Sequence, residues 1–482
     1  MIGIDLRKTD KKPGGELNFR YPYVVGLALV SALGGFLFGY DWVVIGGAKP
    51  FYEAYFGLTS SFDIGLAMSS ALIGCLAGAA LSGFITDRIG RKKVLIFSGL
   101  LFTLSAVGTA YTVSFNLFIW ARIMGGIGIG LASNVSPMYI AEISPAEHRG
   151  RFVSINQLTI VIGILAAQIT NWLIAEPVPA DATQSVILES WNGQYGWRWM
   201  FGAEAFPAFI FFAMAWFIPE SPRWLLKENY NEKARDVLSK IGGDEYAERE
   251  LESVKTTLEE EKEKISVKEL WKPALLPILV LGVGLAVFQQ WSGINVIFNY
   301  AEEVFTSAGY TISDMLFNII VTGTINLIFT LVAMKVVDNW GRKKLMLIGA
   351  GGLTATYLLL AFFYYTEILG MHMLLLVVVA IALYAMSLAP VTWVIISEIF
   401  PNRIRGAAMS VSVFALWTAS LILTYTFPIL NQGLGEGAKG TALTFCVYAG
   451  ICVLGFFLIR KYLPETKGKS LEELEKELIL KK

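Results

Sequence analysis

Cysteine, histidine and charged residues are all scarce in this chain of 482 residues. Its three cysteines, Cys75, Cys446 and Cys452, lie in apolar runs and show neither metal-ligand spacing nor a disulfide framework. The two histidines, His148 and His372, stand far apart, and we interpret both as ordinary residues near helix ends. A metal site built from several nitrogen or sulfur ligands is not expected. The sequence therefore predicts no metal and no cofactor.

Charge is low and balanced. Charged residues make up 16% of the chain and hydrophobic residues 55%, whereas soluble domains carry about 25% charged residues. Lysine plus arginine and aspartate plus glutamate number 39 each, so net charge indicates no nucleic acid partner. The mean hydropathy is +0.57, which predicts a protein embedded in a lipid bilayer. Residues 1–20 are polar and lead into an apolar run without a cleavage site, so we expect no cleaved signal peptide.

Apolar runs long enough to cross a bilayer recur along the chain. Since a spanning helix needs about 20 mostly apolar residues, these runs predict about twelve spans. They lie near residues 21–47, 63–85, 94–112, 115–141, 150–175, 197–218, 273–306, 313–336, 344–364, 372–399, 405–430 and 439–462. The predicted fold class is all-α integral membrane, and an even number of spans places both termini on one side.

Loops rich in lysine and arginine alternate with loops that lack them. The rich loops cover residues 87–93, 144–151, 338–344 and 401–406, whereas 173–197 and 301–314 contain no basic residue. By the positive-inside rule, the rich loops and both termini are cytoplasmic. Residues 220–270 are highly charged and lack a crossing apolar run. We expect them to form short amphipathic helices on the cytoplasmic face.

Three motifs recur in the same order in the second half of the chain. DRIGRKK at 87 returns as DNWGRKK at 338, AEISPAEHRG returns as SEIFPNRIRG, and PESPR at 219 returns as PETKG at 464. This repetition indicates a duplicated six-span unit, with a substrate site near the midplane between the halves. The expected divisions are a cytoplasmic tail 1–20, a first half 21–219, a linker 220–270, a second half 271–463 and a cytoplasmic tail 464–482.

Three charged residues, Asp41, Arg122 and Glu204, lie deep within separate apolar spans. An aspartate at a helix centre costs about 2.5–3.5 kcal/mol on insertion scales, so such residues usually mark a substrate pathway or proton relay. The two acids and one base can neutralise one another, and a carboxylate whose partner moves can change protonation. The alternative is a static ion pair, but buried pairs contribute little net stability.

Several spans also contain amides, which are costly in an apolar surrounding unless they are paired. They are Gln157, Gln289, Gln290, Asn295 and Asn326. In the repeat, Asn295 stands where Asp41 stands in the first half, and the neighbouring Gly293 predicts a break in the seventh span. The amides favour a polar ligand, although one amide alone fits a helix–helix hydrogen bond worth about 0.6 kcal/mol equally well.

After its first 20 residues, the chain resembles the sugar porter branch of the major facilitator superfamily. The resemblance rests on an ordered set of motifs: DRIGRKK, RIMGGIGIGLASNVSPMYIAEISPAEHRG, PESPRWLL, QQWSGINVIFNYA, PVTWVIISEIFPNRIRG and LPETKGKSLEEL. It implies the major facilitator fold, with two six-helix halves that rock between two states. It also implies a monomeric, multi-pass importer of a monosaccharide in a bacterial inner membrane, driven by the proton gradient.

The resemblance implies roles for individual residues. The sugar-binding positions are matched by Gln157, Gln289, Gln290, Asn295 and Trp393, with Asn326, Trp417 and Phe38 as lining residues. The proton-coupling positions are matched by Asp41, Arg122 and Glu204. The cytoplasmic gating clusters are matched by Glu142, Arg149, Arg91, Glu220 and Arg223 in the first half and by Arg342, Glu398 and Arg405 in the second, and Tyr300 matches the outer gate. For the arginines of these clusters, orientation of the spans is the alternative explanation.

Three departures from the family pattern bear on the substrate. Ile164 replaces a glutamine of xylose carriers and resembles the glucose carriers, and Leu416 replaces an amide that reaches the sugar in relatives. Asn299 replaces the first residue of a tyrosine pair at the outer gate. The first two changes remove hydrogen-bonding groups from the pocket. This favours a hexose such as glucose or galactose over the pentose xylose, but it does not assign the sugar.

Four other functions remain to be weighed. A passive facilitator of the same fold is the main alternative, but passive glucose carriers have an amide in place of Asp41. A sugar sensor would carry long cytoplasmic extensions, whereas the tail after Leu463 is short. A sodium-coupled carrier would need several oxygen ligands together, and the first predicted span contains only one carboxylate, Asp41. An enzyme is not expected, because no nucleophile–base pair is visible and GGIGIG lies within a span, where small residues serve helix packing.

Overall fold

The computed structural model describes residues 19–145, 148–179, 182–260, 270–273, 275–401, 404–435 and 437–467. The regular secondary structure in these ranges is entirely helical and includes no strand, as predicted. The predicted cytoplasmic tails lie outside the described residues, except for a few positions next to the first and last helices.

The first half consists of five long helices and a broken sixth span. Its elements are α1 (Tyr21–Phe56), α2 (Ser61–Ile89), α3 (Arg91–Tyr111), α4 (Phe115–Ile143), α5 (Arg149–Ile174), α6 (Gln184–Glu189), the π-helix η2 (Asn192–Gly196), α7 (Trp197–Gly202) and α8 (Ala205–Ala215). The predicted first span ended at residue 47, but α1 continues for two further turns until Gly57, whose φ of 63° ends it in a left-handed cap.

The described part of the charged stretch between the halves is largely helical, and residues 261–269 of this stretch lie outside the described residues. It contains α9 (Pro222–Lys227) and α10 (Asn231–Glu260), and α10 is kinked at Gly243, where φ is 84°. The linker packs on the start of α1, because the Arg20 N–H donates to the Ile241 carbonyl at 2.8 Å. The Phe19 ring lies edge-on to the Tyr246 ring, with centroids 5.1 Å apart.

The second half repeats this plan with two broken spans. Its elements are α11 (Leu276–Trp291), α12 (Ile294–Asn299), α13 (Ala301–Ser307), α14 (Ile312–Trp340), α15 (Arg342–Tyr365), α16 (Met371–Met386), α17 (Leu388–Glu398), α18 (Arg405–Leu434) and α19 (Gly437–Tyr462). The seventh span breaks at Gly293, as predicted, because its φ of 88° is accessible to glycine but strained for other residues. The tenth span breaks at Ser387, between α16 and α17.

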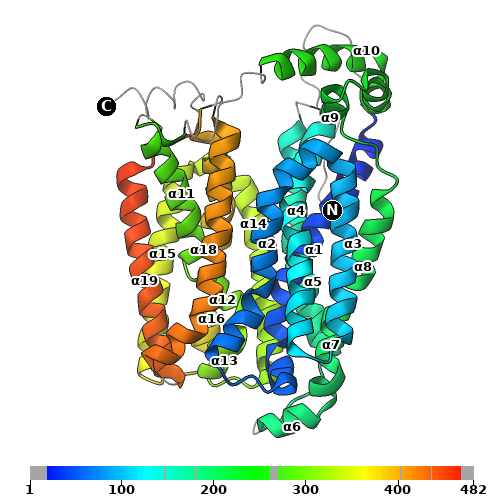
Figure 1. Cartoon of the computed structure of the whole chain (residues 1–482). Helices are drawn as coiled ribbons and strands as arrows, with labels where there is room; N and C mark the ends of the chain where they lie inside the picture. The colour runs from blue at the N-terminus through cyan, green and yellow to red at the C-terminus, as the bar shows by residue number, and fades with distance from the viewer. Residues whose placement is uncertain are drawn as a thin grey trace.

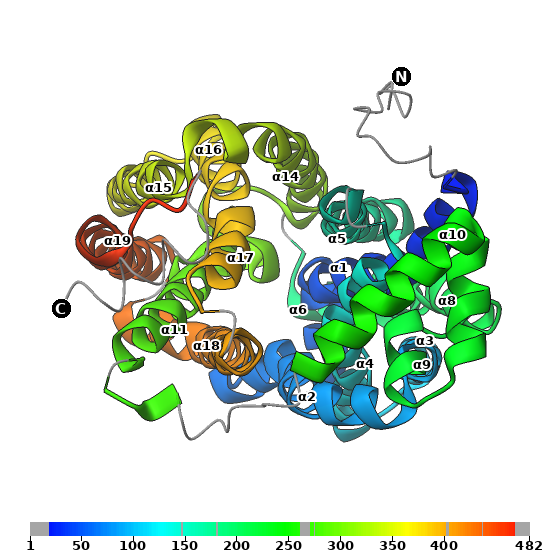
Figure 2. The same cartoon turned by 90° about the horizontal axis from the view of Figure 1, so that it is seen from above.

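The two halves stand side by side, and α9 and α10 lie across one end of the first half (Figure 1, Figure 2). We call this the cytoplasmic end, following the positive-inside rule, and the opposite end, which carries α6, the outer end. Eleven helices of the described chain are long and apolar enough to span a membrane. The sixth predicted span is the broken pair α7 and α8, so the prediction of about twelve spans is confirmed.

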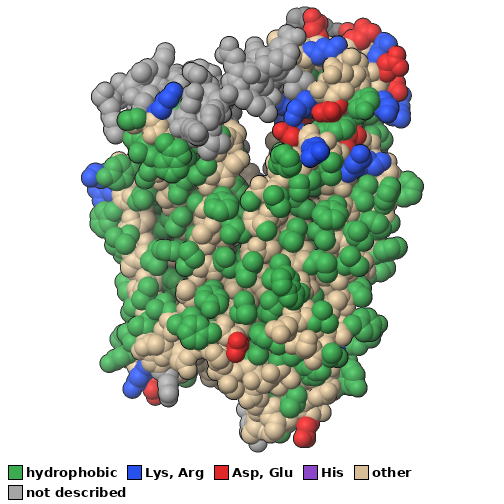
Figure 3. Space-filling view, in the orientation of Figure 1, with side chains coloured by type: hydrophobic (Ala, Val, Ile, Leu, Met, Phe, Trp, Pro, Cys, Tyr) green, Lys and Arg blue, Asp and Glu red, His purple; other side chains and the backbone are tan. Residues whose placement is uncertain are grey.

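The halves meet towards the outer end and separate towards the cytoplasmic end. Ser61 of α2 hydrogen-bonds to Gln432 of α18, and the Val178 N–H donates to Ser313 Oγ of α14 at 2.9 Å. Figure 3 shows a hollow between the halves near the cytoplasmic end, above a broad apolar belt. The structure is therefore closed on the outer side and open towards the cytoplasmic side.

The GGIGIG motif serves helix packing, as expected. A Cβ atom on Gly126 would collide with the Ala71 carbonyl, and one on Gly130 would collide with the Cys75 carbonyl. The backbones of α2 and α4 approach each other this closely only because these side chains are absent.

Candidate functional site

Asp41, Arg122 and Glu204 come together in the core of the first half. Asp41 lies in the middle of α1, Arg122 lies in α4, and Glu204 lies in the break between α7 and α8. Arg122 Nη1 contacts Asp41 Oδ1, and Arg122 Nη2 donates to the Asp41 backbone oxygen at 3.2 Å. Each of the three residues is only 2% exposed. The fold therefore assembles the predicted trio.

The trio retains buried polar atoms that have no hydrogen-bond partner in the described part of the chain. These atoms are Asp41 Oδ2, Arg122 Nε and Glu204 Oε1. Glu204 interacts electrostatically with both Asp41 and Arg122. With two acids and one base, full ionisation leaves one uncompensated negative charge in a buried site, which is costly. One proton on either carboxylate removes that charge.

Three amides form a hydrogen-bonded chain where the seventh span is broken. Gln290 Nε2 donates to Gln289 Oε1 at 2.8 Å, and Asn295 Nδ2 donates to Gln290 Oε1 at 2.6 Å. Gly293 joins the two helices that carry them, so residues from both sides of the break meet. All three amides are at most 7% exposed. Broken helices of this kind line the substrate sites of transporters.

The remaining predicted sugar-site residues come from helices of both halves. Phe38 lies on α1, Gln157 on α5, Asn326 on α14, Trp393 on α17 and Trp417 on α18. Figure 2 shows that these helices border the space between the halves. Asn326 is 6% exposed, whereas Trp393 is 38% exposed. The set therefore surrounds the interface between the halves, as a carrier that alternates its access requires.

An aromatic triangle joins α1 to α18 across the interface between the halves, and sequence reasoning predicted only two of its members. The ring centroids of Phe38 and Trp417 are 5.7 Å apart, and Trp42 lies 5.9 Å from Phe38 and 6.0 Å from Trp417. Trp42 is one turn from Phe38 on α1, and this i, i+4 spacing was the available signal. Trp417 is 3% exposed, and its Nε1 has no partner among the described residues.

The three residues that depart from the family pattern differ in how far they are buried. Leu416 is 2% exposed in α18, next to Trp417, and Ile164 is half-buried in α5. Asn299 is 4% exposed at the end of α12, and its Oδ1 has no partner among the described residues. A Cβ atom on Gly46 would lie 3.0 Å from the Asn299 carbonyl oxygen, so α1 touches α12 at this point.

Glu142 and Glu220 organise the cytoplasmic end of the first half. Arg91 donates from Nε and Nη2 to the two carboxylate oxygens of Glu142, both at 2.9 Å. Glu220 accepts from the backbone N–H groups of Arg91 at 2.8 Å and Lys92 at 3.1 Å, so it caps α3. Burial raises the pKa of the Glu220 carboxyl, and the backbone N–H groups that it accepts from oppose this effect. Ser221 also donates to Glu142.

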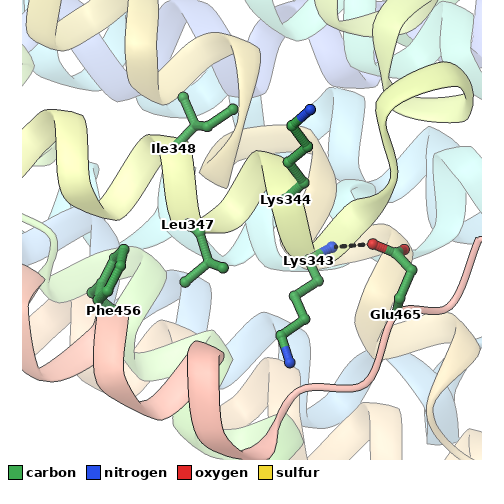
Figure 4. Close-up of a pocket in the computed structure, with 6 residues that line it drawn as sticks. All are labelled: Lys343, Lys344, Leu347, Ile348, Phe456 and Glu465. Atoms are coloured by element: carbon green, nitrogen blue, oxygen red, sulfur yellow. Dashed lines mark hydrogen bonds between the residues drawn. The ribbon is translucent and has the colours of Figure 1, made fainter.

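The second half builds the same cluster from the repeated motifs. Arg342 Nη2 donates to Glu398 Oε1 at 3.1 Å, and Thr466 Oγ1 donates to Glu398 Oε2 at 2.6 Å. Glu465 accepts from the backbone N–H of Arg342 at 2.8 Å and from that of Lys343 at 3.1 Å, and Figure 4 draws the second of these bonds. The pocket in Figure 4 is lined by residues of α15, Phe456 of α19 and Glu465. It contains none of the predicted sugar-site residues.

The other predicted gating residues are placed as follows. Arg149 Nε donates to the Ala141 carbonyl at 3.0 Å, near the end of α4. Arg223 lies in α9, and the side chain of Arg405 lies outside the described part of the chain. Tyr300 is fully buried between α12 and α13, and its hydroxyl donates to the Thr424 carbonyl of α18 at 2.5 Å.

Sequence reasoning missed a second group of charges near Tyr300. Lys49 and Glu53 lie on the outer part of α1, and Glu302 and Glu303 lie on α13. The Lys49 Nζ atom is within 3.0 Å of a carboxylate oxygen of each of the three acids. The predicted first span ended before Lys49, so this lysine was not recognised as a buried charge.

Residues 27–478 match the sequence model of the family described as "Sugar (and other) transporter". The chain is 38% identical to the D-xylose-proton symporter of Escherichia coli K12, over 95% of this chain and 97% of that protein. It is 39% identical to the glucose transport protein of Synechocystis, over 94% of this chain and 97% of that protein.

Among solved structures, the inward open conformation of the E. coli xylose transporter XylE is similar, with a TM-score of 0.82 and 37% identity. The match covers 95% of this chain and 100% of XylE. Both the predicted resemblance and the major facilitator fold are thereby confirmed. The chain is a multi-pass membrane transporter rather than an enzyme, and it belongs to the sugar transporter family.

Proposed function

We propose that this chain is a proton-coupled symporter that imports a monosaccharide by alternating access of its two halves. The observation that carries the proposal is the buried pair of Asp41 and Arg122, with Glu204 beside it. A carrier that only facilitates diffusion has no need of a carboxylate at this depth, where charge is expensive. The proton-symport named for the E. coli relative supports the same function.

Protonation of Asp41 is the coupling step. When Asp41 is ionised, Arg122 holds it in the geometry described above. A proton that arrives from the outer side neutralises Asp41 and weakens its attraction for Arg122, which is then free to pair with Glu204. Because Asp41 lies in α1, where the neighbouring Trp42 contacts Trp417 of the second half, this change of partner alters how α1 packs. Sugar binding and reorientation follow from the neutral state.

The sugar is bound by amides and covered by aromatic rings. Gln289, Gln290 and Asn295 supply donors and acceptors for several hydroxyl groups, and Gln157 supplies another amide from the first half. Trp393 and Trp417 offer flat apolar faces to the sugar ring, each with one donor. Ile164 and Leu416 remove hydrogen-bonding capacity from this pocket, so a hexose is favoured over xylose.

The cytoplasmic clusters act when the carrier faces outward. In the present conformation Arg91 pairs with Glu142 and Arg342 with Glu398, each within its own half. Closing the cytoplasmic hollow brings these ends together and lets the charged side chains pair between the halves. The carrier works as a monomer in the bacterial inner membrane, with both termini in the cytoplasm and no cofactor.

Sugar uptake into energised cells tests this function. Glucose, galactose and xylose are screened with and without a protonophore, for the wild type and for Asp41→Asn. We expect accumulation of one sugar that collapses with the protonophore, whereas Asp41→Asn only equilibrates that sugar across the membrane. The matched control is Asp63→Asn, an exposed aspartate in the first turn of α2, which should accumulate sugar normally.

Two results would identify other functions. Uptake that never exceeds equilibrium, and that is the same in Asp41→Asn, would make the chain a passive facilitator. Binding of sugar without measurable uptake or exchange in proteoliposomes would make it a sensor.

A further inference from the structure

Lys49 joins the two halves at the outer end. Its Nζ atom lies 2.9 Å from Glu302 Oε2 and 2.8 Å from Glu303 Oε1, both on α13 of the second half. It also lies 3.0 Å from Glu53 Oε1, one turn further along α1. We call these four residues the outer ion cluster. It links a helix of the first half to a helix of the second.

The outer ion cluster is buried. The Lys49 side chain is only 4% exposed, and the three glutamates are 13 to 22% exposed. A lysine is almost never buried to this extent unless it is paired, because the unpaired ammonium group loses its hydration without compensation. The pairs with Glu302 and Glu303 can form only while α1 and α13 are in contact. The burial of Lys49 is therefore tied to the closed outer end.

The backbone around the cluster is in close contact as well. A Cβ atom on Gly46 would lie 2.8 Å from the Phe298 carbonyl oxygen of α12, so α1 reaches the second half through a position without a side chain. Lys49 lies about one turn beyond this contact. In the repeat, Lys49 follows Asp41 by as many residues as Glu303 follows Asn295. The two ends of this ion pair thus occupy equivalent positions of the two halves.

The charges in the cluster are unequal, with one lysine facing three glutamates. If Lys49 is lost, Glu53 on one half faces Glu302 and Glu303 on the other without a counter-charge, and like charges repel. Removing one partner of a buried pair is costly because the remaining charges are left uncompensated. This repulsion would favour separation of the two halves at the outer end. Lys49 is the one cation of this cluster, and the closed arrangement depends on it.

We propose that the outer ion cluster is a latch that holds the outer end closed while the carrier is open to the cytoplasm. The ion pairs of the latch must break each time the carrier opens to the outside. Their strength therefore sets the equilibrium between the inward-open and outward-open states. This inference rests on the alternating access of the proposed function, but it does not depend on the coupling ion or on the identity of the sugar. It assigns a positioning role to Lys49 that is separate from the trio around Asp41.

The latch is tested by measuring how accessible the outer end is to a reagent. A single reporter cysteine replaces Asn299, which is 4% exposed beside Gly46, in a background in which the exposed Cys446 is changed to serine. Intact cells are treated with a membrane-impermeant maleimide in the absence of sugar, and the labelling rate is measured. We expect slow labelling in this parent and about tenfold faster labelling in Lys49→Met, because the uncompensated acids open the outer end.

A second variant removes the same ion pairs by changing the residues of the second half. In Glu302→Gln with Glu303→Gln, Lys49 keeps only Glu53 of its own helix, so labelling should again accelerate. The exchange Lys49→Glu with Glu303→Lys restores one cation and three acids and should return labelling to the slow rate of the parent. The matched control is Lys439→Met, an exposed lysine at the start of α19, which should label as slowly as the parent.

The proposal is overturned if Lys49→Met and the double glutamine variant both label within about twofold of the parent. The equilibrium between the two states would then be the same with and without the latch. It is also overturned if the charge exchange labels as fast as Lys49→Met, or if Lys439→Met accelerates labelling to the same degree. The assay contains no sugar, and a protonophore is added to the cells so that no proton gradient is present. A failure of proton coupling would leave these labelling rates unchanged, so the two proposals fail separately.

Discussion

Asp41 and Asn295 occupy equivalent positions in the two halves, and the fold gives them different partners. Asp41 is paired with Arg122 of α4, whereas Asn295 donates a hydrogen bond of 2.6 Å to Gln290 across the break of the seventh span. A carboxylate can gain and lose a proton, but an amide cannot. The duplicated framework thus carries a protonatable group in one half and a neutral hydrogen-bonding group in the other.

Arg122→Met should destabilise the protein strongly. The substitution leaves Asp41 and Glu204 buried next to each other without a counter-charge, and breaking a buried pair in this way costs about 3–5 kcal/mol. We expect a lower thermal unfolding temperature for the purified carrier in detergent. Adding Asp41→Asn to Arg122→Met should restore part of the loss, because one of the two unpaired carboxylates is then neutral.

The stability measurement separates this explanation from a loss of packing. Arg122 also lies over the Phe201 ring, with its guanidinium carbon 5.2 Å from the ring centroid. If the double variant unfolds at the same temperature as Arg122→Met, lost contacts with rings such as Phe201 account for the effect and the charge argument is wrong.

Gln290→Ala should weaken sugar binding more than any other single amide change near the break. Gln290 accepts from Asn295 and donates to Gln289, so its removal frees two neighbours as well as losing its own contacts. A buried polar group left unpaired costs about 1–3 kcal/mol, which corresponds to roughly 5- to 150-fold in the dissociation constant. Titration calorimetry of the Gln290→Ala variant with the transported sugar measures this dissociation constant.

The control for this change is Asn339→Ala, which removes an amide at the cytoplasmic end of α14. Its Nδ2 donates to the Lys335 carbonyl at 2.9 Å, and affinity should not change. Equal losses of affinity in both variants would show that the effect is one of general stability and not of the sugar site.

Two tryptophans allow binding and stability to be separated. Trp291 Nε1 donates to the Ala419 carbonyl at 2.9 Å, whereas Trp417 Nε1 is buried without a partner in the described chain. Trp291→Phe should therefore cost about 1 kcal/mol of stability and leave sugar affinity unchanged. Trp417→Phe should leave stability nearly unchanged and weaken sugar binding severalfold, because it removes the donor available to a hydroxyl group.

Thermal unfolding and sugar titration of the two variants provide the readouts. The interpretation is contradicted if Trp417→Phe unfolds at a lower temperature than Trp291→Phe while binding sugar normally. In that case the Trp417 indole N–H would have a structural role.

The sequence predicted the arrangement of the spans and the charged trio because both follow from the cost of polarity in a bilayer. An acid such as Glu204 within an apolar run is visible without any structure. The break at Gly293 was also predictable, since glycine next to amides in a span indicates irregular backbone. The cytoplasmic pairs of Arg91 with Glu142 and Arg342 with Glu398 followed from the repeated motifs.

Other features depend on where helices end and how the halves meet. Lys49 was overlooked because hydropathy falls at Pro50 although α1 continues to Phe56. Its partners Glu302 and Glu303 are far away in sequence, and only the packing of α1 against α13 brings them together. The tilted contact between the Trp42 and Trp417 rings likewise depends on how the halves pack. Such contacts belong to one state of the carrier, so no periodicity within a single span indicates them.

Glu220 and Glu465 should contribute equally and independently to stability. Each carboxylate accepts from two backbone N–H groups at the start of a helix, α3 for Glu220 and α15 for Glu465, with the shorter bond at 2.8 Å in both halves. Substitution by alanine leaves those N–H groups unpaired at a positive helix end, which should cost about 1–2 kcal/mol in each case. Thermal unfolding of Glu220→Ala, Glu465→Ala and the double variant measures these losses, with Glu228→Ala, an exposed glutamate after α9, as the matched control. Because the two caps lie in separate halves, the losses should add. A double variant that unfolds much earlier than the two single losses predict would mean that the clusters interact between the halves in this conformation, contrary to the pairing of each cluster within its own half.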